Sequence, residues 1–247
     1  VSWNINGLSS LQNSFPLKQG DTVIRTLEEL FKFLDADIIC FQETKIMRGK
    51  IQASLALVDG YDAYFSCCYT ASKRGYSGVA TYCRVSTPHA SPVEAEEGFT
   101  ATLPKCSTAS VGYYERMWSQ FNPTELRELD SEGRCVITDH DLFVLFNVYF
   151  PNAGVSDIDT ASDSRYQYKL KFYHAFQLRC ESLLAAGRHV VVVGDVNCVH
   201  QPIDSCDPTR TVKNHLGDAV DFWTLPHRKW LHAFLCDGGG QFVDVFR

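Results

Sequence analysis

The stretch Val190–Asp204 constrains the fold more than any other part of the chain. It reads Val-Val-Val-Val-Gly-Asp-Val-Asn-Cys-Val-His-Gln-Pro-Ile-Asp. Four successive β-branched residues predict a central strand that is covered on both faces, and Gly194 ends the run. Asp195 and Asn197 follow two positions apart, so on an extended chain both side chains point to the same side. This pattern favours a buried strand that feeds an active site, and the alternative is a simple turn, because Gly, Asn and Asp commonly form turns.

Polar side chains are also expected at the ends of two strands in the N-terminal region. Residues 1–6 predict a strand that ends in Asn4 and Asn6. Ile38–Phe41 is a short apolar run typical of a buried strand, and Glu43 follows it directly. A carboxylate therefore again lies at the end of a strand.

Periodicity and capping signals predict the other elements. Apolar residues spaced by three and four after Asp21, the expected N-cap, predict an amphipathic helix that ends near Leu34. Residues 98–133 mix small and polar residues, and we expect a surface excursion with one short helix that starts at Asn122-Pro-Thr-Glu125. Trp3 is expected in the core. Further strands are expected at 61–68, 78–83, 134–138 and 142–150, and further helices at 165–186 and 226–236.

Composition narrows the class of protein. The 247 residues are 45% hydrophobic and 21% charged, as in a globular protein, and their number fits a single domain over 1–247. No stretch approaches the ~20 apolar residues of a membrane span, and no signal peptide opens the chain, so we expect an intracellular protein with no membrane partner. The 10 cysteines include no Cys-x-x-Cys pair, which favours buried free thiols over disulfides or a zinc site. The net charge of −6 is unfavourable for DNA binding, although local basic loops are compatible with it.

Five segments in a fixed order resemble the endonuclease/exonuclease/phosphatase family of metal-dependent phosphodiesterases. They are Val1-Ser-Trp-Asn-Ile-Asn-Gly-Leu8, Asp37-Ile-Ile-Cys-Phe-Gln-Glu-Thr-Lys45, Gly75-Tyr-Ser-Gly-Val-Ala80, Asn147-Val-Tyr-Phe-Pro-Asn-Ala153 and Gly194-Asp-Val-Asn197. The chain is similar to the apurinic/apyrimidinic (AP) endonucleases, and the phrases Glu94-Ala-Glu-Glu-Gly98 and Asp130-Ser-Glu-Gly-Arg134 are similar to the AP endonuclease 2 branch.

The resemblance sharpens the fold class. Patterning alone predicts an α/β protein with mixed sheets and helices outside them. The resemblance implies a four-layered α/β sandwich, in which two mixed β-sheets pack face to face, helices flank them and the last strands are missing. The site would lie at one end of the sandwich.

The resemblance also implies roles for the polar residues at the strand ends. Glu43 is the expected ligand of Mg²⁺, or of Mn²⁺ in its place, and Asn6 is an additional metal contact. Asp195 is expected to orient or deprotonate the attacking water. Asn4 and Asn197 are expected to hold the phosphate and the carboxylates in register.

Four further residues are implied in catalysis and DNA binding. Tyr149 is expected to contact the phosphate or to assist the leaving group. Asn152 resembles a phosphate-binding Asn, and Gly75 and Tyr76 correspond to a loop that contacts the DNA backbone. Taken singly, such residues also fit ordinary strand ends, turns or core positions, and their joint occurrence in order favours the site.

The implied function is a DNA repair nuclease that hydrolyses the phosphodiester at abasic sites and has 3′–5′ exonuclease or 3′-phosphodiesterase activity. The implied partner is double-stranded DNA with abasic sites or blocked 3′ ends, in the nucleus or also in mitochondria. A sliding clamp is expected only through a tail beyond this chain. Two alternatives stay open: a non-catalytic protein that binds damaged DNA, and a phosphodiesterase of the same fold that acts on phosphoinositide or phospholipid head groups.

Two later motifs of the family are absent from the sequence. These are a strand like Ser-Arg-Leu-Asp-Tyr and a terminal Ser-Asp-His. The pair Asp139-His140 precedes Tyr149 and is expected to be a loop, not a substitute. We therefore expect a catalytic domain that is incomplete at its C-terminus, with impaired hydrolytic activity.

Overall fold

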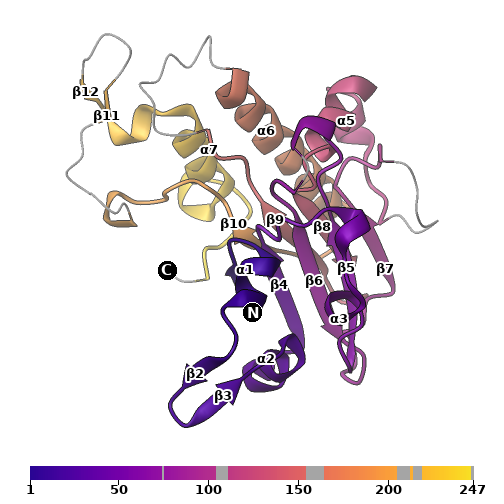
Figure 1. Ribbon diagram of the computed structural model, residues 1–247. Helices are drawn as coiled ribbons and strands as arrows, with labels where there is room; N and C mark the ends of the chain where they lie inside the picture. The colour runs from indigo at the N-terminus through magenta and orange to yellow at the C-terminus, as the bar shows by residue number, and fades with distance from the viewer. Residues whose placement is uncertain (74, 104–110, 154–163, 205–211, 214–218, 246–247) are drawn as a thin grey trace. The chain divides into compact units, whose positions relative to one another are not determined.

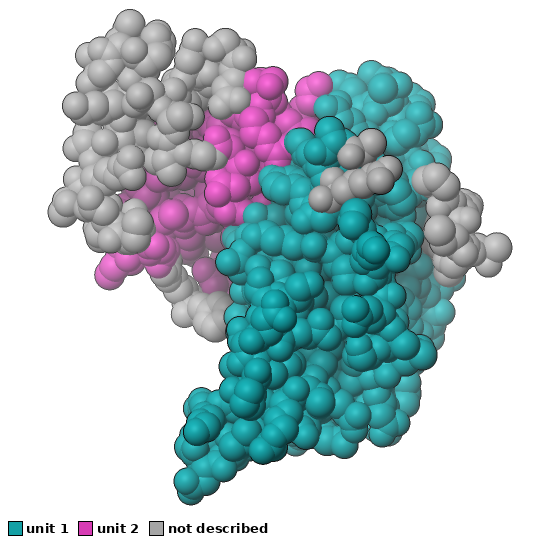
Figure 2. Space-filling view, in the orientation of Figure 1, with its two compact units in different colours: residues 1–149, 178–195 teal, residues 150–177, 196–247 magenta. Residues whose placement is uncertain are grey.

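A computed structural model describes residues 1–73, 75–103, 111–153, 164–204, 212–213 and 219–245 (Figure 1). The chain divides into two compact units, which Figure 2 colours separately: unit 1 is Val1–Tyr149 with Leu178–Asp195, and unit 2 is Phe150–Gln177 with Val196–Arg247. Among the described helices, none has the length and apolar character that crossing a membrane requires.

The first sheet of unit 1 has four strands in the order β1-β4-β6-β5. Strand β1 (Ser2–Asn4) runs parallel to β4 (Ile38–Gln42). Strands β6 (Val79–Arg84) and β5 (Tyr61–Ser66) continue the sheet in antiparallel pairing. The strands predicted from the apolar runs in this region are confirmed.

The second sheet of unit 1 has four strands in the order β10-β9-β8-β7. Strand β10 (Val190–Asp195) runs parallel to β9 (Val144–Tyr149). Strands β8 (Cys135–Asp139) and β7 (Glu94–Glu97) pair in antiparallel fashion. Both sheets are therefore mixed, as predicted.

A buried polar network lies between the two sheets. Asn147 of β9 accepts a hydrogen bond on Oδ1 from Gln42 Nε2 of β4 at 2.8 Å. Its Nδ2 donates to the Ala80 carbonyl at 2.9 Å and to Thr81 Oγ1 at 3.1 Å, both on β6. A buried amide without partners costs about 1–3 kcal/mol, so this network favours one alignment of the facing sheets.

Helices cover the outer faces of the two sheets. Helix α2 (Leu27–Leu34) packs Phe31 against the Tyr82 ring of the first sheet, with ring centroids 4.8 Å apart. The part of helix α6 (Ser164–Ala185) that belongs to unit 1, from Leu178 onward, is joined to β7 of the second sheet by the buried pair Arg179–Glu96 at 3.3 Å. Helices outside facing sheets make the four layers that the resemblance implies.

The predicted N-cap Asp21 is wrong. Residues Thr22–Ile24 form β3, which pairs with β2 (Leu17–Gln19) in a hairpin. Helix α2 begins only at Leu27, and Thr26 is its N-cap, accepting a hydrogen bond from the Glu29 backbone N–H. Val23 and Ile24 match the helical spacing by chance. They belong to strand β3 of the hairpin and not to the helix.

Within residues 98–133, the described parts 98–103 and 111–133 are more buried than predicted. Phe99 and Met117 are both 0% exposed. The Asp130 carboxylate accepts hydrogen bonds from the backbone N–H groups of Phe99 and Thr100 at 2.9 and 3.0 Å. Asp130 thus satisfies buried backbone groups, so a polar composition alone does not indicate a solvated loop. The predicted short helix is confirmed as α5 (Pro123–Asp130), with the Asn122 and Glu125 capping box at its start.

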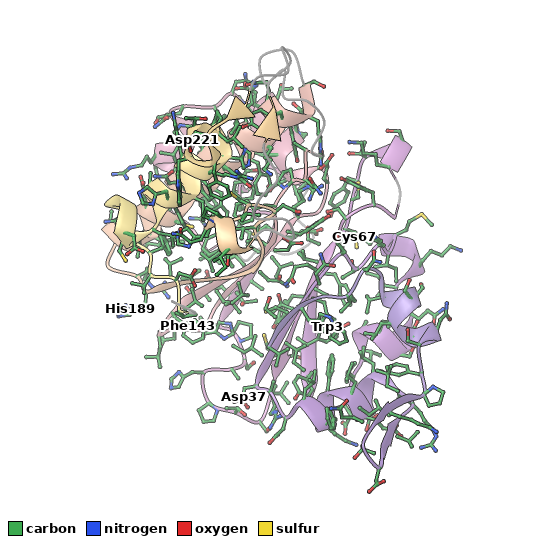
Figure 3. All side chains as sticks on the ribbon, turned by 90° about the vertical axis from the view of Figure 1, so that its left-hand side faces the viewer. Trp3, Asp37, Cys67, Phe143, His189 and Asp221 are labelled. Carbon is green, nitrogen blue, oxygen red and sulfur yellow. The ribbon has the colours of Figure 1, made fainter. Side chains whose placement is uncertain are left out.

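Strand β10 is an edge strand among the described residues, not the central strand predicted. Its one described neighbour is β9, and Val191 is 41% exposed. An apolar run shows that both faces of a strand tolerate burial, but it does not determine how many strands pair beside it. Trp3, labelled in Figure 3, is likewise not a core residue, because it remains 40% exposed and touches the core through the Phe41 ring at 6.2 Å.

Unit 2 has an aromatic centre. The Phe150 ring packs edge-on against three aromatic rings of α6. On α7 (Pro226–Phe234) the Trp230 ring stacks on Tyr173 with ring centroids 4.2 Å apart. The predicted helices at 165–186 and 226–236 are confirmed. The remaining elements are α1 (Leu8–Asn13), α3 (Ala53–Ala56), α4 (Glu115–Trp118), β11 (Val212–Lys213), β12 (Ala219–Val220) and short 3₁₀ turns.

Candidate active site

Strands from both sheets of unit 1 bring two carboxylates to one carboxamide. Asn4 ends β1 beside Gln42, the last residue of β4. Asp195 ends β10 beside Tyr149. Asn4 Nδ2 donates to Glu43 Oε1 at 3.0 Å and to Asp195 Oδ2 at 2.9 Å. Parallel pairing in each sheet therefore delivers three of the predicted site residues to one cluster.

The backbone around this cluster is in unusual conformations. Asn6, Glu43 and Lys45 have φ values of 51°, 55° and 50°. This left-handed region costs roughly 1–2 kcal/mol for each residue with a side chain, apart from the more tolerant Asn. Gly194 has a φ of 135°, and a Cβ there would lie 1.9 Å from the Val148 carbonyl oxygen. These strained turns place the polar side chains at the strand ends.

Lys45 is a member of the cluster that the sequence analysis did not assign. Its Nζ lies 2.7 Å from Glu43 Oε2 and also donates to Asn6 Oδ1. The side chain of Lys45 is 39% exposed, against 18% for Glu43. Its place two residues after Glu43 is a weak signal, because the contact depends on the left-handed turn between them.

A hydrogen bond between Glu43 and Tyr149 contributes to the pKa shifts of both groups. Burial raises the pKa of the Glu43 carboxyl, but hydrogen bonds from Asn4, Lys45 and Tyr149 outweigh burial and leave the pKa below its usual value. Burial, and then the hydrogen bond to Glu43, raise the pKa of the Tyr149 phenol well above its usual value. The site therefore combines an ionised carboxylate with a phenol that keeps its proton at neutral pH.

Arg134 is a second residue without a role in the sequence analysis. It is 1% exposed, and its guanidinium lies over the Tyr149 ring at 4.7 Å and over the Tyr76 ring at 5.4 Å. It donates to the Tyr149 carbonyl at 3.0 Å and to the Tyr76 hydroxyl at 3.1 Å. Glu132 Oε2 accepts from its Nε at 2.7 Å. Arg134 thereby ties the loop that carries Tyr76 to the strand that carries Tyr149.

The backbone of Gly75 lies close to the backbone of Lys45 in the same cluster. It has a φ of 74°, and a Cβ there would lie 3.4 Å from the Lys45 carbonyl oxygen. Gly75 therefore lies beside Lys45, whose ammonium contacts Glu43. Tyr76 is linked to Tyr149 through Arg134.

The structure places Asn152 and Asn197 in unit 2. Asn197 Nδ2 donates to the Phe150 carbonyl at 2.9 Å, and Lys169 Nζ donates to the Asn197 carbonyl at 2.7 Å. The exposed Asn152 accepts on its carbonyl from Arg165 Nε at 3.3 Å. The extended backbone assumed between 195 and 197 is wrong, because Asn197 has a left-handed φ of 46°.

The pair Asp139 and His140 has structural partners. The loop prediction holds for His140, whereas Asp139 is the last residue of β8. Arg188 donates to both carboxylate oxygens of Asp139, at 2.8 and 2.6 Å. The His140 ring is bonded to the His89 carbonyl at 3.0 Å and to Thr138 Oγ1 at 2.8 Å. Neither residue joins the cluster around Asn4.

The donor set of the cluster fits a hard cation. Glu43 and Asn6 direct a carboxylate and a carboxamide oxygen at the same positive group, the Lys45 ammonium. Mg²⁺ prefers oxygen ligands and usually takes one or two protein carboxylates. Among the described residues no group of three or more His, Cys, Asp or Glu side chains could hold a metal ion, and the described cysteines are free thiols.

Comparison with known proteins places the chain in a family. Residues 1–241 match the Endonuclease/Exonuclease/phosphatase family. The whole chain aligns with DNA-(apurinic or apyrimidinic site) endonuclease 2 of Mus musculus at 38% identity and of Homo sapiens at 39% identity, covering 47% of each relative. The chain thus spans about half the length of the curated relatives it matches.

Solved structures give the same result. The crystal structure of the Xenopus laevis APE2 catalytic domain is 41% identical, with a TM-score of 0.78, over 100% of this chain and 70% of that one. The AP endonuclease of Leishmania major is 22% identical, with a TM-score of 0.64, over 96% of this chain and 65% of that one, and shares the fold. This chain belongs to the Endonuclease/Exonuclease/phosphatase family.

Proposed function

We propose that the chain is part of a DNA repair nuclease that hydrolyses phosphodiesters at abasic sites and at blocked 3′ ends, with 3′–5′ exonuclease activity. One observation carries the proposal: the Asn4 carboxamide joins the Glu43 and Asp195 carboxylates of two different sheets. Relatives named as AP endonuclease 2 support the choice of DNA as the substrate. In this proposal residues 1–247 act as one catalytic domain in the nucleus.

A divalent cation, Mg²⁺ or Mn²⁺, would be held by Glu43 and Asn6. It would neutralise negative charge on the scissile phosphate. Fixed left-handed turns at both residues support this role, because ligand oxygens that are already in place lose little freedom on binding.

Asp195 accepts the proton of the attacking water as a new P–O bond forms and the bond to the leaving oxygen breaks. Asn4 keeps the Asp195 carboxylate oriented through its 2.9 Å hydrogen bond. Tyr149 retains its proton, since burial and Glu43 raise its pKa, and donates a hydrogen bond to a phosphate or leaving oxygen.

The proposed DNA contacts begin with the loop that carries Gly75 and Tyr76. Gly75 and Tyr76 lie on a loop tied to Tyr149 through Arg134, which suits a contact with the DNA backbone. For Asn152 and Asn197 the motif match supports phosphate binding.

The test is Mg²⁺-dependent cleavage of a labelled duplex with one abasic-site analogue. The 247-residue chain and the same chain extended through the downstream reading frame are each assayed with Asp195→Asn and with Asp62→Asn, an exposed carboxylate of β5, as the control. Loss of the base should lower the rate about 10²–10⁴-fold, whereas the control should match wild type.

Cleavage that survives Asp195→Asn would refute the proposed role of this residue. Binding of the abasic duplex without cleavage by either form would support the damage-binding alternative. Hydrolysis of a phosphoinositide but not of DNA would support the other alternative.

A further inference from the structure

We propose that Lys45 is a tethered counter-ion of the metal site: its ammonium holds the position of the divalent cation and is displaced when the cation binds. The inference rests on the metal dependence of the proposed function. It assigns to Lys45 a part in metal binding that differs from that of a ligand, because an ammonium group has three donors and no acceptor.

The contacts divide the oxygens of the cluster into two sets. Lys45 Nζ lies 2.7 Å from Glu43 Oε2 and donates to Asn6 Oδ1. The amide of Asn4 takes the other carboxylate oxygen, Glu43 Oε1, at 3.0 Å. The ammonium therefore contacts Glu43 Oε2 and Asn6 Oδ1, the two oxygens proposed to face the cation. The Asn4 amide bonds a different oxygen and does not compete for them.

The backbone around Lys45 is held by hydrogen bonds, whereas the lysine side chain is partly exposed to solvent. The Lys45 N–H donates to the Ser77 carbonyl at 2.8 Å, and the Thr44 N–H donates to the Gly78 carbonyl at 3.0 Å. The left-handed turn at Glu43 is thereby clamped to the segment that leads into β6. The Lys45 side chain is 39% exposed, and a released ammonium is strongly hydrated, so displacement requires rotation of one side chain and no change of backbone.

The competing explanation is that Lys45 only orients Glu43 and Asn6. The two explanations predict opposite signs. If Lys45 orients the ligands, its removal loosens them and weakens metal binding. If Lys45 is a counter-ion, its removal eliminates both a competitor and a like charge next to the cation, and metal binding becomes tighter.

The experiment is a titration of the intact chain with Mn²⁺, followed by the electron paramagnetic resonance signal of the free ion, at low ionic strength. Lys45→Met should bind Mn²⁺ at least about tenfold more tightly than wild type, and Lys45→Arg should stay close to wild type. The control Lys73→Met removes the same charge from an ammonium that lies 2.8 Å from Glu132 and does not touch the ligands. It should change the affinity less than twofold.

A second measurement uses the wild-type chain alone. In ¹⁵N spectra of the lysine Nζ groups, the Lys45 resonance should move on addition of Mg²⁺ and saturate with the same midpoint as metal binding. Equal or weaker Mn²⁺ binding by Lys45→Met, or a Lys45 resonance that ignores Mg²⁺ while the metal binds, would overturn the inference and leave the proposed function intact. Absence of any Mn²⁺ binding by wild type would remove the metal from the proposed function and the inference with it.

Discussion

Replacing Asn4 separates a lost hydrogen bond from an added charge. Asn4→Ala removes two hydrogen bonds to carboxylates, at 3.0 and 2.9 Å. Because the site is only partly buried, water replaces part of each bond, and we expect a loss of about 1–3 kcal/mol in the free energy of unfolding. Asn4→Asp removes the same bonds and adds a third carboxylate between Glu43 and Asp195.

For the Asn4→Asp variant, the cost of a third ionised carboxylate has to be compared with the cost of protonating one carboxyl. Two carboxylates about 3 Å apart repel by about 5 kcal/mol at an effective dielectric constant of about 20, and the introduced carboxylate would face two others. Protonating one carboxyl at pH 7 costs about 4 kcal/mol, since its ordinary pKa is about 4 and each pH unit corresponds to 1.36 kcal/mol. Proton uptake is therefore cheaper, and the extra destabilisation of Asn4→Asp over Asn4→Ala should approach about 4 kcal/mol at pH 7.

The assay is urea unfolding of both variants from pH 5 to pH 8 in the presence of a metal chelator. The folded Asn4→Asp variant binds one proton more than its unfolded state, so its deficit should grow by about 1.4 kcal/mol per pH unit. The deficit of Asn4→Ala should stay nearly constant over this range. Equal, pH-independent deficits for the two variants would show that the three side chains do not meet as described.

Three other substitutions test single features of the fold and the site. Arg134→Met should destabilise unit 1 by about 3–5 kcal/mol in thermal or urea unfolding, because it removes the guanidinium that lies 2.7 Å from the buried Glu132 carboxylate. Asp139→Asn should cost about 1–3 kcal/mol near neutral pH. Burial raises the pKa of Asp139, but the Arg188 hydrogen bonds outweigh it and lower the pKa, so this stabilisation is present above about pH 4 and is lost as pH falls through the folded pKa; urea midpoints of wild type and variant should converge there. Gly194→Ala should cost more than about 3 kcal/mol and abolish cleavage, since its Cβ would lie 1.9 Å from the Val148 carbonyl oxygen.

Matched variants distinguish these effects from general loss of structure. Arg134→Lys keeps the charge but not the planar group over two tyrosine rings, so it should recover only part of the stability. Gly20→Ala also changes a glycine of positive φ, 59°, but nothing lies within 4 Å of its Cβ, so its cost should stay near 1 kcal/mol. If Gly194→Ala behaves like Gly20→Ala, the close approach of β10 to β9 is not as described.

The sequence predicts well those features that depend on local pattern. Ile38–Phe41 is a strand because its apolar residues suit a buried sheet, and it appears as β4. The capping box of Asn122 and Glu125 fixes the start of α5 through neighbouring residues alone. The resemblance adds the two facing sheets, which no local pattern specifies.

The missed features depend on contacts between distant segments. Arg134 is a fully buried cation, which is uncommon, and its burial requires Tyr76, 58 residues away, together with Tyr149. The contact of Lys45 with Glu43 requires a positive φ at Glu43, and propensity disfavours such a turn at a glutamate. The edge position of β10 among the described strands is a property of its neighbours, so its own apolar residues could not indicate it.

The bond between Asn4 and Asp195 joins residues 191 positions apart, and this has a consequence for protein synthesis. A ribosome that adds about 5–20 residues per second needs roughly 10–40 s to travel from the first to the second. Throughout that interval the nascent chain carries Asn4, and for most of it Glu43, without their partner. Assembly of the cluster is thus delayed until the whole of unit 1 has been synthesised, so the proposed site stays incomplete in a growing polypeptide.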